Sequence, residues 1–321
     1  MTAHQPLRHA HPGAAAPHRT AYSPTSTGSS VGLFIAGVYL RSLRMSRELG
    51  VAAVCKKAAL TRGKLLGAEN GTYALGLDEI TALLTGPYNM PEQVCRGLVD
   101  FLQAAADADL VAGESVVDTG SGWQGRLAAL EHRATAAVLY TRELPGFLRE
   151  PDHTSPLGGF GAGIPRPGII GTDTTVITDE SVLGRLPRDP ELRRAQLQRL
   201  LAAADDDRVQ LRLLPHTHLR REAGPLTELI VPASAPASAD DLWVYITEAD
   251  GSAVYDAGPA AEARLGGLVN GALTAALTAD ETRVRLRAAA TSTHPVAPAG
   301  APYASAHAVP HTAGPQTGVG Q

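Results

Sequence analysis

The spacing of the apolar residues changes once along the chain, and this change limits what the sequence can fold into. In the first part apolar residues recur at helical spacing in five segments, at residues 32–48, 51–58, 61–69, 77–84 and 91–106. This spacing gives each segment one apolar face, as in amphipathic helices. Because very short turns join the segments, the first part is predicted to be a compact all-α, five-helix domain.

Beyond about residue 125 the pattern becomes mixed. Short strand-like runs occur at residues 174–179, 209–215, 226–231, 242–248 and 252–257. Helical patterns lie before, between and after them, at residues 126–140, 190–204, 259–277 and 280–289. Consecutive strands joined by short turns favour antiparallel pairing. The second part is therefore predicted to be an α+β domain with a mainly antiparallel sheet.

The two ends of the chain differ from the middle. Residues 1–31 and 291–321 are rich in His, Pro, Ser and Ala and contain no periodic apolar face. Such segments bury too little apolar surface to offset the entropy of ordering, so both are expected to be disordered tails. The helical domain is placed at residues 32–106, a linker at 107–124 and the α+β domain at 125–290.

Several features bear on location. Residues 1–31 lack the apolar stretch of a secretory signal, and the longest apolar run, near residues 31–40, is too short to cross a bilayer. Cys55 and Cys95 could pair, but buried free thiols in a reducing cytosol are favoured. We expect a cytoplasmic protein with no membrane partner.

Residues 40–71 follow the order of a helix-turn-helix motif, with a first helix, a short second helix, a tight turn and a third helix. Thr61 stands at the expected N-cap of the third helix, and Arg62 and Lys64 follow in its first turn, where base edges and phosphates are met. Small or aliphatic residues are placed to lock the second helix to the third: Val54, Ala58, Leu60, Leu65 and Ala68.

Positive charge is concentrated in the same stretch. Residues 40–64 contain seven basic residues and one acidic residue, a local charge of +6 in a chain whose net charge is −4. A local cationic surface is what DNA phosphates require, although basic residues can also simply solvate helix faces. The candidate DNA-binding residues are Arg41, Arg44, Lys56, Lys57, Thr61, Arg62 and Lys64.

This part resembles the xenobiotic-response-element (XRE) type of helix-turn-helix found in actinobacterial regulators. Residues 40–44 (LRSLR) match the family's L-R-x-L-R, residues 69–71 (ENG) its E-x-G, and residues 78–84 (DEITALL) its D-V-x-A-L-L. The resemblance implies sequence-specific binding of double-stranded DNA, with a homodimer facing a two-fold operator.

The second part resembles the uncharacterised domain that follows this motif in antitoxin-like (Scr-type) regulators. Residues 144–148 (LPGFL) are similar to its V-P-G-L-L, residues 178–183 (TDESVL) to its L-D-E-A-V-L, and residues 209–215 (VQLRLLP) to its V-x-V-x-V-L-P. The resemblance implies a transcriptional regulator whose second domain receives an input, either a ligand or a small protein partner.

Three departures from the family pattern keep an alternative open. Val51 replaces a polar residue early in the second helix, and Gly63 and Gly67 stand in the third helix where DNA-contacting side chains are common. The family's helix rich in Arg and Gln is replaced by a Gly/Pro-rich stretch at residues 153–171. The alternative is a degenerate helix-turn-helix that serves as a protein-protein interaction module.

Other constellations predict less. Most histidines lie in the two tails, where nothing holds metal ligands in advance, so no metal site is expected. The glycines at residues 158–163 lack the lysine of a phosphate-binding loop. Asp179, Glu180, Glu248 and His216 accompany no nucleophile motif. We therefore expect no cofactor and no enzymatic activity.

Overall fold

Five helices make up the first part of the structure, which is a computed structural model that describes residues 31–110, 115–150, 173–206, 208–215, 225–232, 241–249 and 251–291. These helices are α1 (Val31–Ser46), α2 (Val51–Ala58), α3 (Arg62–Glu69), α4 (Leu77–Thr85) and α5 (Glu92–Leu110). The predicted helical first part is confirmed. Apart from Val31 and Thr291, the two expected tails lie outside the described residues.

The second part of the structure is built around a sheet. Its strands are β1 (Ser115–Asp118), β2 (Ala136–Thr141), β3 (Asp173–Asp179), β4 (Val209–Leu214), β5 (Leu226–Val231), β6 (Leu242–Ala249) and β7 (Ser252–Ala257). Within the described residues they form one seven-stranded sheet in the order β1-β7-β6-β5-β2-β3-β4. The pairs β2–β3 and β3–β4 are parallel, and the other four pairs of neighbouring strands are antiparallel. The predicted mainly antiparallel sheet is therefore confirmed.

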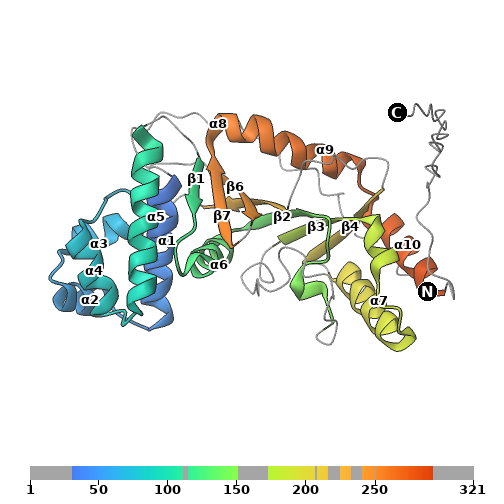
Figure 1. Ribbon diagram of the computed structural model, residues 1–321, viewed down its shortest axis with the longest axis horizontal. Helices are drawn as coiled ribbons and strands as arrows, with labels where there is room; N and C mark the ends of the chain where they lie inside the picture. The colour runs from blue at the N-terminus through green and yellow to red at the C-terminus, as the bar shows by residue number, and fades with distance from the viewer. Residues whose placement is uncertain are drawn as a thin grey trace, which may run out of the picture.

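Helices cover both faces of the sheet (Figure 1). One face carries α6 (Trp123–Arg133), α7 (Pro190–Asp205) and α10 (Ala279–Thr291), whose leucines share a core with the first five helices. The other face carries α8 (Gly258–Ala261), the π-helical turn η5 (Glu262–Gly266) and α9 (Gly267–Ala275) over a second apolar cluster. Two 3₁₀ turns, η1 (Gly146–Leu148) and η3 (Glu180–Arg185), complete the described elements.

The helix predicted over residues 126–140 is wrong in its second half. The helix α6 ends at Arg133, and β2 begins at Ala136 between β5 and β3. Ala137, Leu139 and Tyr140 are all buried, so this central strand shows little alternation between apolar and polar residues. A short apolar run of that kind has no period that distinguishes a strand from the continuation of a helix.

The segment at residues 107–124, predicted to be a linker, contributes an edge strand. Here β1 pairs antiparallel with β7, with Val116 opposite Tyr255. The sheet therefore begins within the segment predicted to be a linker. None of the helices in the described ranges combines the length and apolar character that a membrane span requires.

Candidate nucleic-acid interface

The helices α2 and α3 are joined by a tight turn. Ala59 adopts the left-handed conformation (φ 53°), and its N–H donates to the carbonyl of Cys55. Thr61 then caps α3, because its Oγ1 accepts a hydrogen bond from the N–H of Lys64 at 3.3 Å. The predicted N-cap is thus confirmed, and three residues, 59–61, separate the two helices.

Apolar packing fixes the angle between these two helices. The five residues predicted to lock them together are all buried, and Val54 and Leu65 are fully buried: Val54, Ala58, Leu60, Leu65 and Ala68. Because the apolar side of each short helix faces this core, the opposite sides face solvent. The sides exposed to solvent carry most of the candidate residues.

Three cations project freely from the solvent-facing side. Lys56 and Lys57 are exposed in the last turn of α2, and Arg62 is exposed at the start of α3. Within the described part of the chain, none of the three forms an ion pair with a carboxylate. Thr61 and Gly63 are exposed beside them. We call Lys56, Lys57, Thr61, Arg62 and Gly63 the α2–α3 surface.

Lys64 lies next to this surface but is held by neighbours. Its Nζ is 2.5 Å from Oε1 of Glu79 in α4 and 5.8 Å from the centre of the Tyr73 ring. The hydrogen bond with Glu79 raises the pKa of Lys64, and the same bond lowers the pKa of Glu79, with help from the N–H of Gly76. Lys64 therefore links α3 to α4 as well as adding charge.

Arg44 is turned inward. Its Nε and Nη2 donate to the two carboxylate oxygens of Glu69 at 2.6 and 2.8 Å, and Nη1 donates to the Leu49 carbonyl. Glu69 is only 2% exposed, and its hydrogen bond raises the pKa of Arg44. The fork ties α1 to the end of α3, which is a structural use of a residue predicted to bind DNA.

Arg41 lies on the side of α1 that faces α6. It is partly buried, and its positive charge reinforces the effect of burial in lowering the pKa of Arg133 of α6. The structure thus separates the seven candidates. Lys56, Lys57, Thr61 and Arg62 are exposed on either side of the turn between α2 and α3, and Lys64 follows in α3, whereas Arg41 and Arg44 lie on α1.

Sequence reasoning missed the acidic partners Glu69 and Glu79. A signal for Glu69 was present, since it begins the matched ENG segment and Arg44 ends the matched LRSLR segment. The structure shows that these two motif residues bind each other. Glu79 is the third residue of α4, and its carboxylate also accepts from the Gly76 N–H, as at many helix starts.

The acidic residues considered for acid–base chemistry do not converge. Asp179 accepts from the N–H of Ser181, and Glu180 pairs with Arg285. Glu248 is on β6, which is separated from β3 by β5 and β2. In the described ranges no cluster of His, Cys, Asp and Glu could hold a metal ion. His216 and the glycine-rich residues 158–163 lie outside those ranges.

Comparison with known proteins gives one similarity. A family model described as a domain of unknown function, DUF5753, matches residues 170–288. The matched segment contains β3 to β7 and most of α10, and it lies entirely in the second part of the chain. No curated protein and no solved structure matches the chain.

Proposed function

We propose that this protein is a sequence-specific, DNA-binding transcriptional regulator of the XRE, antitoxin-like type. The observation that carries the proposal is the α2–α3 surface, where Lys56, Lys57 and Arg62 are exposed and unpaired in the described structure at a helix-turn-helix bend. Cations that neutralise phosphates release condensed counterions, and this release supplies much of the affinity for DNA.

The geometry suits a helix that enters the major groove by its N-terminal end. Arg62 is the first residue of α3, and the positive end of the helix dipole at that first turn favours contact with a phosphate. Lys56 and Lys57 flank it from α2 and would bind the adjacent backbone. Arg62 is then the residue placed to reach a guanine edge.

The remaining parts of the proposal rest on the resemblance. Two copies would place their α3 helices about 34 Å apart on a two-fold operator. The second part, which includes the segment similar to the domain of unknown function, would receive a ligand or a small protein partner in the cytoplasm.

A second candidate function, a protein-interaction module without sequence reading, is favoured by Gly63. This residue is exposed in the first turn of α3, and a Cβ added there would meet no atom within 4 Å. A position that commonly supplies a base contact therefore carries no side chain. Gly67 does not support the same argument, because its added Cβ would lie 2.9 Å from the Cβ of Tyr73. The close packing of Tyr73 accounts for that glycine.

The proposal is tested by binding the purified protein to fragments of its own upstream region across a salt series, with random DNA as competitor. Arg62→Ala should weaken binding by about 1–3 kcal/mol and relax base preference. Lys56→Ala and Lys57→Ala should weaken binding to all sequences alike and each lower the salt slope by about 1.

The matched control is Arg194→Ala, which removes an exposed arginine from α7, the helix that packs against β4 at the opposite end of the sheet from β1. DNA binding that persists in the presence of the competitor and is weakened by Arg62→Ala supports a sequence-reading regulator. Binding that Arg62→Ala weakens no more than Arg194→Ala contradicts the assignment of α3. Equal affinity for random DNA, or no binding, supports the interaction module.

A further inference from the structure

The first part of the chain contacts the second through backbone atoms of glycine residues. Gly97 of α5 faces the loop that follows β1, and a Cβ added to Gly97 would lie 2.1 Å from the carbonyl oxygen of Ser121. A Cβ added to Gly120 would lie 2.5 Å from the carbonyl oxygen of Gly97. Only glycine at both positions lets the helix and the loop approach this closely.

A buried ion pair holds that loop in place. Arg126 of α6 donates to both oxygens of Asp118 of β1, at 2.7 Å from Nε and 2.6 Å from Nη2. Both side chains are fully buried. The guanidinium also donates to the carbonyls of Gly120 and Ser121, at 3.1 and 3.3 Å. Its fork therefore binds the strand and the loop at the same time.

The ion pair lies where the two parts of the molecule meet. The Arg126 guanidinium lies 5.4 Å from the centre of the Phe101 ring of α5, and that ring packs edge-on against Tyr255 of β7 at 6.0 Å. One arginine thus contacts the strand β1, the loop after it and the long helix α5.

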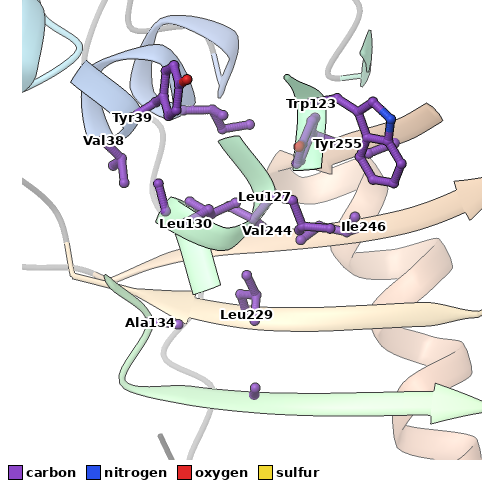
Figure 2. Packing of buried hydrophobic residues seen from close by; sticks show 14 of the residues in the cluster. Val38, Tyr39, Trp123, Leu127, Leu130, Ala134, Leu229, Val244, Ile246 and Tyr255 are labelled. Atoms are coloured by element: carbon purple, nitrogen blue, oxygen red, sulfur yellow. The ribbon is translucent and has the colours of Figure 1, made fainter. Parts of the chain in front are cut away.

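Apolar packing continues across the same junction. Figure 2 shows Val38 and Tyr39 of α1 above Leu127 and Leu130 of α6, with Val244 of β6 beneath them. These residues belong to one hydrophobic cluster that spans both parts of the described chain. Parts of a chain that move independently usually meet through smaller and more polar interfaces.

We infer that the helical first part and the sheet form one rigid body, and that the Asp118–Arg126 pair locks the direction of the α2–α3 surface relative to the sheet. Asp118 and Arg126 are positioning residues in this scheme. One consequence rests on the proposed function: an input received by the second part acts on DNA binding by changing how two copies are arranged. It does not act through a hinge between the two parts of one copy.

The first test uses the unmodified full chain in a scanning calorimeter. A single rigid body should unfold in one transition with equal calorimetric and van't Hoff enthalpies. Two resolved transitions would overturn the inference, since they would show that the two parts unfold separately.

The second test measures the distance between spin labels on the two parts. The labels are attached at Thr81→Cys in α4 and Gln198→Cys in α7, which are both exposed, in a chain carrying Cys55→Ala and Cys95→Ala. Without further change we expect one narrow distance peak. A broad or two-peaked distribution would overturn the rigid body.

Arg126→Met should abolish the single narrow peak, because Asp118 and the loop lose their anchor. The matched control is Arg149→Met, which removes an arginine that binds Glu143 and the Leu144 carbonyl within the second part. This control should keep the narrow peak. An unchanged peak in Arg126→Met would overturn the role of the ion pair. If Arg126→Met does not fold, the calorimetry and the label distances of the unmodified chain still test whether the two parts form one rigid body.

Neither measurement includes DNA. Absence of DNA binding with one narrow peak would therefore reject the proposed function alone, whereas DNA binding with a broad distribution would reject the rigid body alone.

Discussion

Basic residues are used differently in the two parts of the molecule. On the α2–α3 surface Lys56, Lys57 and Arg62 extend into solvent without a carboxylate partner in the described structure. In the second part several arginines bind the protein itself. Arg212, for example, donates to the carbonyls of Ala276 and Leu277, and Arg285 pairs with Glu180. Unpaired charge is available for a partner, whereas paired charge stabilises the fold, so net charge alone does not locate a binding surface.

The largest expected effect comes from the buried pair at the junction. Arg126→Met leaves the Asp118 carboxylate buried and unpaired, so the free energy of unfolding should fall by about 3–5 kcal/mol, measured by denaturant titration. Arg96→Met, which removes a solvent-exposed ion pair with Glu92, should change it by less than about 1 kcal/mol. Similar changes in the free energy of unfolding for the two variants would mean that burial does not determine how much each arginine stabilises the fold.

Arg44 provides the next test, because the sequence groups it with the exposed cations and the structure groups it with the paired ones. Arg44→Met should lower the free energy of unfolding by about 2–3 kcal/mol, since nearly buried Glu69 loses both of its hydrogen bonds. DNA affinity, measured where the variant is fully folded, should change less than in Arg62→Ala. A large loss of DNA affinity with normal stability would return Arg44 to the candidate DNA-binding residues.

The two glycines of α3 should respond with opposite signs. Gly63→Ala should raise the free energy of unfolding by up to about 1 kcal/mol, because alanine favours a helix and the site is open. Gly67→Ala should lower it, because the new Cβ must push Tyr73 aside. Thermal unfolding of both variants checks this, and stabilisation in both would show that Tyr73 moves freely.

The smallest effect concerns the Lys64–Glu79 pair. The folded state lowers the pKa of Glu79, so the stability from this carboxylate is present above its unfolded pKa, about 4.3, and is lost as pH falls through the lower folded value. The folded state raises the pKa of Lys64, so its contribution is present below about pH 10.4 and is lost as pH rises further. Glu79→Gln should flatten the stability profile slightly at both extremes, and an unchanged profile would contradict the pairing.

Much of the fold could be predicted because its signals are local. The strands at residues 226–231 and 252–257 and the cap at Thr61 are set by side-chain pattern and turn chemistry within a few residues. The strand β2 could not be predicted because it is buried on both faces. The strand β1 is only four residues long and is identified by pairing with a strand more than a hundred residues away.

The candidate site was predictable in outline only. The sequence by itself determined where positive charge gathers and where the chain bends between α2 and α3, because both depend on neighbouring residues. Only the tertiary structure decided that Arg44 meets Glu69, that Lys64 meets Glu79 and that Arg126 meets Asp118 beside α5 at the junction. The first two partners come from other helices and the third follows a turn of the chain. The role of a charged side chain depends on which partner the packing of the fold brings beside it. No local sequence pattern encodes the distance between the two side chains.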